Sequence, residues 1–151
     1  SELLDALQMG GIDVFENNLE KLNRLGTQVY APGKWTVNQM VEHLMDTERI
    51  FVARSLRFAR NDNTELPGYD HDQYVAESRS NDIPLEKLIQ QYKQIRKGTI
   101  ATFENFNNEE LMRVGVANGN KISVLTMGFV LVGHPIHHYK MLEEKYFPLI
   151  G

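Results

Sequence analysis

The sequence predicts an all-α fold: a four-helix bundle of up-down-down-up topology with a long crossover between the second and third helices. Four segments carry apolar residues at the spacing of a single helix face. A long polar stretch, residues 61–83, separates the second segment from the third, so these two helices need not be antiparallel neighbours. With 151 residues and 42% hydrophobic content, the chain fits one domain, residues 1–151, with its own core.

The first helix is predicted for residues 12–25. Apolar side chains recur there at helical spacing, and Gly26 follows as a natural C-cap. The apolar pattern also continues upstream, at residues 3–7. Gly10 and Gly11 lie between, and each would cost about 1 kcal/mol inside a helix. The sequence therefore leaves open whether the helix extends back through them.

The second helix is predicted for residues 37–60. Thr36 and Gln39 have the spacing of a capping box, and Trp35 and Met40 have that of a hydrophobic staple. A helix of this length spans about 36 Å.

The crossover contains a candidate for a short helix at residues 73–77. Asp82 and Pro84 then open the third helix, because proline is tolerated in a first turn that needs no amide partner. The apolar stripe of this helix runs over residues 85–106.

Residues 109–112 form a small helical candidate after the third helix. Asn118 and Gly119 then predict a tight turn between two short extended pieces. The fourth helix is predicted to start at Ser123 and to end at about Phe147.

Four of the five histidines lie on the two helices that this topology makes antiparallel, and three of them can share one level. His134 and His138 are four residues apart and so stack on one face of the fourth helix. His43 lies about 10 Å after the start of the second helix, and His138 about 13 Å before the end of the fourth. In an antiparallel pair these levels nearly coincide, whereas a parallel pair would separate them by more than about 10 Å. The sequence therefore predicts one shared site.

Three neutral imidazoles bind zinc, nickel or a similar divalent ion, and three protein ligands leave a position open for water or substrate. A single histidine is more often a core or boundary residue hydrogen-bonded to its neighbours. Three histidines at one depth favour a metal site, with His43, His134 and His138 as ligands and Zn or Ni as cofactor. Pro135, between two of them, removes the partner of the Leu131 carbonyl and kinks the helix.

Metal-binding imidazoles need hydrogen-bond acceptors at their other ring nitrogen. Asp46 and Glu48 are candidates for this role or for a general base, although such residues are more often solvated charges on a helix face. His137 lies about 100° around the helix from His138. His137 is a candidate for contact with the substrate. A position at the rim of the site, without such contact, is an equal alternative.

Two further groups of residues have a functional and an ordinary interpretation. Arg54, Arg57 and Arg60 recur every third residue and could steer an anionic substrate, but such a stripe more often complements the helix dipole. The Asp70-His71-Asp72 cluster in the crossover could cover the site or bind metal, but such loop clusters are usually solvated.

Composition excludes several classes of protein. A net charge of -4 provides no field for nucleic-acid binding. Without cysteine there is no disulfide and no thiolate ligand or nucleophile. The chain has no signal pattern and no apolar run long enough to cross a membrane, so we expect a soluble cytoplasmic protein that does not bind membranes. The His-Glu-x-x-His motif and the Glu-x-x-His motif of di-iron bundles are also absent.

Four motifs together resemble the DinB-like superfamily of small four-helix-bundle metalloproteins. They are Pro-Gly-Lys-Trp-Thr at residues 32–36, His43 followed by Asp-Thr-Glu-Arg at 46–49, Pro-Gly-Tyr-Asp at 67–70, and Gly-His-x-x-His-His at 133–138. The resemblance implies a divalent metal on His43, His134 and His138, and a homodimer. Pro135 stands where the family usually has a helix-friendly residue.

The resemblance also implies a range of activities. Members of known chemistry include S-transferases and isomerases that use low-molecular-weight thiols, and many others are labelled metal-dependent hydrolases. We therefore expect a small-molecule substrate and a metal-activated thiol or water nucleophile, with thiol transfer preferred. The alternatives are a hydrolase, a non-catalytic metal-binding protein of the stress response, and a helical bundle without metal.

Overall fold

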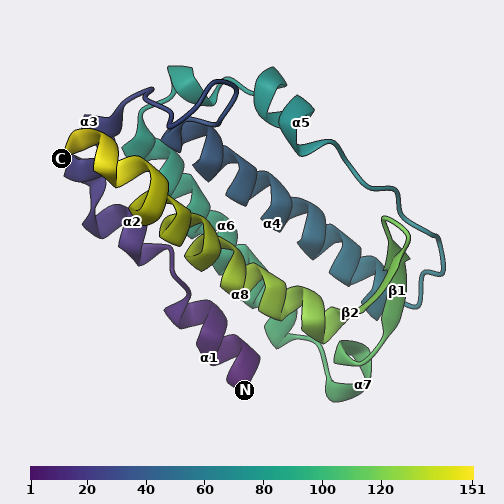
Figure 1. The fold of residues 1–151 in the computed structure, drawn as a ribbon. Coiled ribbons are helices and arrows are strands. Elements are labelled where there is room, and N and C mark those ends of the chain that lie inside the picture. The colour runs from purple at the N-terminus through teal and green to yellow at the C-terminus, as the bar shows by residue number, and fades with distance from the viewer.

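The computed structural model describes residues 1–151 and confirms the four-helix bundle (Figure 1). Three long helices are continuous, and a run of three short helices takes the place of the first. In chain order these are α1 (Glu2–Met9), α2 (Asp13–Asn17), α3 (Leu19–Leu25), α4 (Val37–Ala59), α6 (Leu85–Glu104) and α8 (Val124–Met141). In Figure 1, α4 and α6 run in one direction, while α1–α3 and α8 run in the other, as up-down-down-up topology requires.

Short elements connect and extend the bundle. They are α5 (His71–Glu77), η1 (Ser80–Asp82), α7 (Asn108–Leu111), the antiparallel strands β1 (Val114–Ala117) and β2 (Asn120–Ser123), the π-helical turn η2 (Leu142–Tyr146) and the 3-10 turn η3 (Phe147–Ile150). The predicted turn joins the strands, with positive φ at both Asn118 and Gly119. A bridge between Leu66 and Ala117 fixes the crossover against this hairpin.

The start of α4 confirms the predicted cap. The Thr36 hydroxyl accepts from the Gln39 amide, and the Gln39 side chain accepts from the Thr36 amide. Both interactions satisfy amides that a helix N-terminus otherwise leaves unpaired.

The first helix of the bundle is broken where one helix was predicted over residues 12–25. It divides at Asn18, whose side-chain amide donates to the Val14 carbonyl. A separate helix, α1, precedes the two glycines. Gly11 has a φ of 73°, and a Cβ at this position would lie 2.8 Å from the Ile136 side chain. The positive φ and the close approach of α8 both favour glycine at this position, just after α1 ends at its cap residue Gly10.

The core consists of two hydrophobic clusters at different levels of the bundle. The first is built around α4 residues 37–45, and the second around Phe58 and Ala59 at the other end of the same helix. Between these levels α4, α6 and α8 place buried polar side chains in the interior. This polar layer contains the buried side chains of Glu48, Arg96 and Thr99, together with the buried His43 at the edge of the first cluster and the half-buried His134.

None of the helices has the length and apolar character that crossing a bilayer requires.

Candidate metal centre

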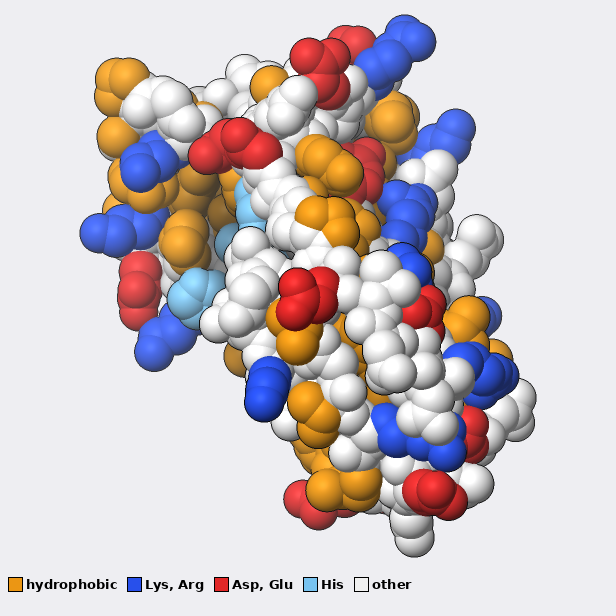
Figure 2. Space-filling view, turned by 90° about the vertical axis from the view of Figure 1, so that its right-hand side faces the viewer, with side chains coloured by type: hydrophobic (Ala, Val, Ile, Leu, Met, Phe, Trp, Pro, Cys, Tyr) orange, Lys and Arg blue, Asp and Glu red, His pale blue; other side chains and the backbone are white.

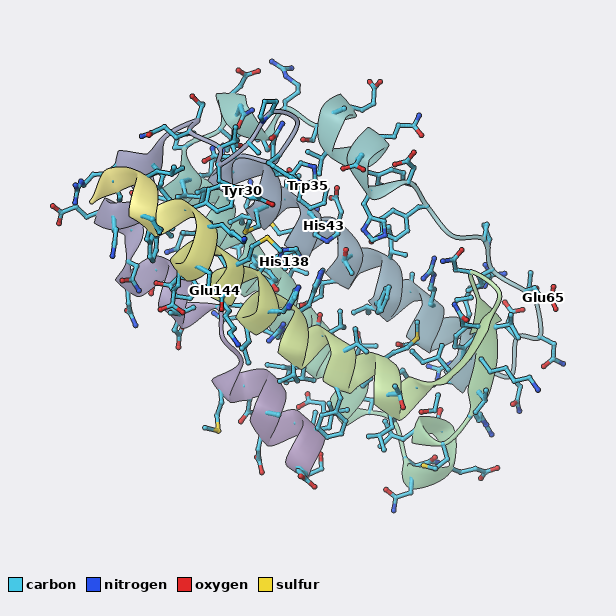
Figure 3. The ribbon with its side chains drawn as sticks, viewed as in Figure 1. Tyr30, Trp35, His43, Glu65, His138 and Glu144 are labelled. Atoms are coloured by element: carbon cyan, nitrogen blue, oxygen red, sulfur yellow. The ribbon has the colours of Figure 1, made fainter.

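Three histidine side chains meet between α4 and α8. The Nε2 atom of His134 lies 3.1 Å from that of His43 and 3.2 Å from that of His138. Figure 3 shows His43 and His138 directed toward one another from these two helices. The antiparallel packing of α4 and α8 places residues 91 positions apart at one level, as the helix lengths predicted.

The spacing of the three nitrogens fits a divalent ion. In a tetrahedral site with metal–nitrogen bonds of about 2.0–2.1 Å, neighbouring ligand nitrogens are about 3.3 Å apart. Two of the three separations, 3.1 and 3.2 Å, are close to that value, and all three ligand atoms lie within 4.8 Å of one another. A neutral imidazole has one N–H donor and one acceptor nitrogen, so three Nε2 atoms pointing at one another cannot satisfy each other fully. A cation accepts all three lone pairs.

Burial holds these imidazoles in the form that binds metal. Desolvation, aided by repulsion from the neighbouring histidines, lowers the pKa of His43 and His134 to about 3. The same causes lower the pKa of His138 to about 4. All three side chains are therefore neutral at pH 7, with lone pairs free for a ligand bond.

Aromatic side chains enclose the site on the solvent side. The Trp35 ring packs on His43 at a centroid distance of 4.7 Å, and its Nε1 atom donates to the Asp72 carboxylate. His71, at the start of α5, lies 5.0 Å from the His43 ring and stacks on Tyr69 at 4.5 Å. The crossover thus lies over the histidines, as one interpretation of the Asp70-His71-Asp72 cluster predicted.

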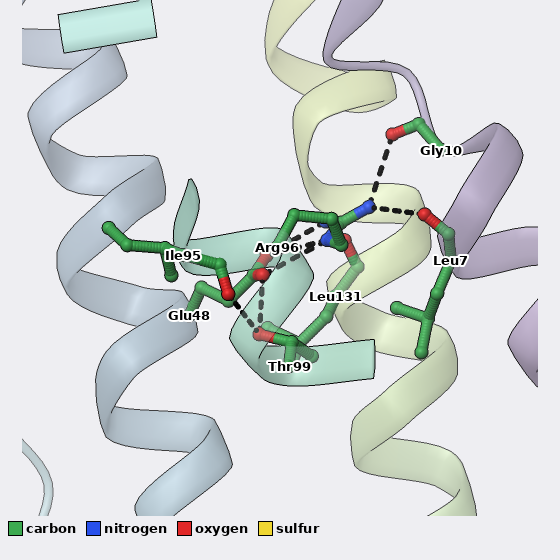
Figure 4. A network of polar contacts seen from close by, with 7 residues as sticks. All are labelled: Leu7, Gly10, Glu48, Ile95, Arg96, Thr99 and Leu131. Carbon is green, nitrogen blue, oxygen red and sulfur yellow. Dashed lines mark hydrogen bonds and ion pairs between the residues drawn. The ribbon is translucent and has the colours of Figure 1, made fainter. Parts of the chain in front are cut away.

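Glu48 forms a buried ion pair with Arg96. It is 1% exposed, so the expectation of a solvated charge is wrong. Its carboxylate accepts from Arg96 at 2.8 Å and from the Thr99 hydroxyl at 2.7 Å, both on α6 (Figure 4). It accepts no hydrogen bond from any histidine. The carboxylate faces α6 and neutralises the buried guanidinium, and these contacts occupy the oxygens that a general base would need.

Arg96 links this carboxylate to the turn of α8 that contains Pro135. Its guanidinium donates to the carbonyls of Leu7 and Gly10 and, at 3.0 Å, to that of Leu131 (Figure 4). Leu131 carries the carbonyl that loses its helical partner to Pro135. Arg96 thus replaces the missing amide one turn before His134, which lets α8 keep a proline between two of the site histidines.

Asp46 and His137 lie close to the centre without contacting its nitrogens. Asp46 forms an ion pair with Arg49 at 3.3 Å and accepts no hydrogen bond from a histidine. His137 is exposed, with its ring 5.3 Å from that of His138. The Nδ1 atom of His138 is buried without a hydrogen-bond partner, so the carboxylate acceptors expected for the imidazoles are not present.

A cleft of about 310 Å³ opens beside His134. It runs between α4 and α8 toward the β1–β2 hairpin, and its walls include Phe51, Tyr69 and Met127. A second hollow of about 300 Å³ lies on the other side, bounded by Trp35 and His138 among others. In Figure 2, histidine side chains are visible between hydrophobic and uncharged ones. A small molecule can therefore reach the histidines from the cleft.

Sequence reasoning missed Arg96, Thr99 and Tyr69 as parts of this region. Arg96 and Thr99 continue the helical spacing that links Tyr92 to Phe103. Polar residues at core positions of an otherwise apolar stripe were the available signal for a buried network. Tyr69, whose hydroxyl lies 2.6 Å from that of Thr47, belongs to the Pro-Gly-Tyr-Asp motif of the crossover, and that motif was the available signal for it.

Comparisons with known proteins agree with the fold. A protein of Oceanobacillus iheyensis, OB0413, provisionally named a metal-dependent hydrolase, is 24% identical over 133 residues, covering 84% of this chain and 76% of the relative. Among solved structures, YfiT from Bacillus subtilis matches with a TM-score of 0.61 and 18% identity, over 88% of this chain and 84% of that one. YfiT is described as an inferred metal-dependent hydrolase with an unusual four-helix bundle topology. At this identity, the structural likeness supports the fold.

The family match covers most of the chain. The model of the DinB superfamily matches residues 15–142, a range that contains all three converging histidines. This chain therefore belongs to the DinB superfamily.

Proposed function

We propose that this chain is a divalent-metal-dependent enzyme in which His43, His134 and His138 hold the cation. The observation that carries the proposal is the convergence of three neutral imidazoles at separations suited to a single ion. A bound zinc or nickel ion would lower the pKa of a thiol or water at its open position and so make a nucleophile at neutral pH. The cleft beside His134 would admit the substrate.

We favour a low-molecular-weight thiol as the nucleophile. A thiol that coordinates a divalent cation loses its proton outright, whereas an attacking water is commonly helped by a positioned general base. No acidic residue lines the cleft, and the two carboxylates of α4 suggested as a general base are paired elsewhere, Glu48 with Arg96 and Asp46 with Arg49. A cleft lined by no carboxylate is better suited to thiol chemistry than to hydrolysis.

Hydrolysis is the second candidate. It is supported by the names given to OB0413 and YfiT, and by one residue of the site. His71 is exposed and lies 5.0 Å from the His43 ring, so it is placed to take a proton from an attacking water.

Activity assays separate these candidates. Zinc-loaded and nickel-loaded protein is given a low-molecular-weight thiol with an aryl halide, and separately an activated aryl ester. We expect metal-dependent thiol conjugation that His138→Ala reduces to the level of metal-free protein. The matched control is Lys140→Ala, which removes an exposed charge from the same helix. Ester turnover without thiol conjugation would favour hydrolysis, and no turnover of either substrate would favour a non-catalytic metal-binding protein.

A further inference from the structure

Arg54 is a nearly buried cation without a partner anion. Of the three arginines along the end of α4, Arg57 pairs with Asp62 at 2.8 Å and Arg60 pairs with Glu110 at 3.2 Å. Arg54 has no ion pair, although it is only 9% exposed. The stripe therefore divides into two neutralised surface residues and one inward-facing residue that is not neutralised.

The guanidinium of Arg54 lines the same cleft as His134. One hydrogen bond holds it, from its NH2 group to the Pro67 carbonyl at 2.8 Å. The rings of Phe51 and Tyr69 lie 5.4 and 5.8 Å from its central carbon. These contacts position the group but supply no negative charge, and a charge removed from water without a counter-charge is costly.

The free donors of Arg54 open into the cleft. None of its nitrogens is both buried and without a partner, so those not bonded to Pro67 remain accessible. Lys121 on β2 also lines the cleft and has no ion pair, and the side chains of Asn118 and Asn120 lie near it. This end of the cleft offers hydrogen-bond donors and positive charge.

The distance from the histidines to Arg54 follows from the helix packing. The Ser55 hydroxyl contacts the Met127 sulfur at 3.4 Å, so Arg54 lies at about the level of Met127. His134 is seven residues further along α8, which corresponds to about 10 Å. Apolar side chains occupy the wall between, including Phe51 and Val130.

We propose that the substrate is an elongated small molecule with a carboxylate about 10 Å from its reacting atom, and that Arg54 binds this carboxylate, with Lys121 as an auxiliary cation. This inference rests on the proposed function, because it takes the histidine centre as the place of reaction. The apolar wall accommodates an aliphatic or aromatic spacer between the two ends. A guanidinium binds a carboxylate through paired, charge-assisted hydrogen bonds.

The ordinary alternative is that Arg54 only ties the crossover to α4 through Pro67. If that is its only role, replacing Arg54 would lower the stability of the protein but would not change its preference for a charged over a neutral ligand. Two probes of equal length test this: mercaptooctanoate and mercaptooctanol, which differ only in a terminal carboxylate or hydroxyl. Dissociation constants are measured by titration calorimetry on metal-free protein and on cobalt-loaded protein.

For wild type we expect mercaptooctanoate to bind about tenfold or more tightly than mercaptooctanol in both forms of the protein. In Arg54→Gln this ratio falls to about one, and Arg54→Lys restores part of it. The matched control is Arg57→Gln, on the same helix, which should keep the wild-type ratio. A ratio near one in wild type, an unchanged ratio in Arg54→Gln, or no binding of the carboxylate to either form overturns the inference.

Cobalt spectroscopy distinguishes this outcome from failure of the proposed function. A thiolate bound to cobalt gives a charge-transfer absorption band that does not depend on Arg54. No such band with any probe would contradict the thiol mechanism, while the carboxylate preference of the metal-free protein would still decide the role of Arg54.

Discussion

At the scale of single residues, burial gives the three histidines their chemistry. Each side chain contributes an Nε2 atom to the interior of the bundle, where desolvation keeps it neutral well below the pH at which a free imidazole takes up a proton. The result is a site ready to bind a cation. Without the metal, keeping these imidazoles neutral should lower the stability of the folded protein at acidic pH.

Metal-free protein should lose stability as the pH falls from about 6.5 to about 4. In this range the unfolded chain protonates its histidines at their ordinary pKa of 6.5, whereas the folded chain resists protonation until about pH 4 or below. The unfolded state then binds more protons, so acid favours unfolding. Urea midpoints measured across this range check the prediction. His138→Gln should flatten the dependence, and an unchanged slope in this variant would contradict the assignment.

Glu42 should act in the opposite direction. Burial, with a hydrogen bond and repulsion from Asp46, raises its pKa from 4.5 to about 7. Between these values the folded state holds a proton that the unfolded state has lost, so this contribution to stability falls as the pH rises. Removing it with Glu42→Gln should make the acid-side loss of stability steeper in the same urea titrations. An unchanged or shallower slope would show that the pKa of Glu42 is not raised.

At the scale of elements, the sequence predicted most of the bundle because its signals are local. The capping box at Thr36 and the turn at Asn118-Gly119 are set by neighbours a few residues away. The convergence of His43 with His134 and His138 could also be derived, since it depends on helix lengths and an antiparallel arrangement. The metal itself and the roles of the nearby acidic residues are not tested by the structure and stay predictions.

Contacts between distant segments were not predictable in the same way. Glu48 and Arg96 are 48 residues apart, and no local pattern pairs them. The break between α1 and α2 lies at Gly11, where α8 approaches closely, and the position of His71 depends on the path of the crossover. These features follow from packing among helices, which periodicity within one helix does not specify.

The buried Glu48–Arg96 pair should be important for the stability of the bundle. Arg96→Met leaves a buried carboxylate uncompensated and removes the donor for the Leu131 carbonyl, so we expect the free energy of unfolding to fall by about 3–5 kcal/mol. The double variant with Glu48→Gln should recover part of this loss. Urea denaturation provides the measurement.

An exposed ion pair is the control for this prediction. Arg57→Gln breaks the pair with Asp62 at the surface and should cost no more than about 1 kcal/mol. If Arg96→Met were as mild as Arg57→Gln, the polar network would not be holding α1, α4, α6 and α8 together.

At the scale of the whole molecule, the polar layer divides the core into two hydrophobic clusters. The histidines occupy this layer, so a cation bound there would link α4 to α8 where apolar contact is interrupted. Zinc at about a hundred times its dissociation constant should stabilise the folded state by about 2.7 kcal/mol, measured as a rise in Tm. The same rise in His134→Ala would contradict binding at this site.

The homodimer implied by the family resemblance stays a prediction. Several apolar side chains of α8 are exposed and could pack against a second copy of the chain, among them Phe129, Val130 and Ile136. Sedimentation equilibrium on wild type should give twice the mass of the chain, and a mass of one chain at all concentrations would contradict it.

The most direct test of the account is the metal content per chain, measured by mass spectrometry on tag-free protein with His43→Ala and His138→Ala beside it. Wild type should contain about one divalent ion per chain, as one set of three ligands implies, and neither variant should contain any. A protein that stays metal-free after incubation with zinc and nickel, or variants that keep the ion, would contradict the three-histidine centre.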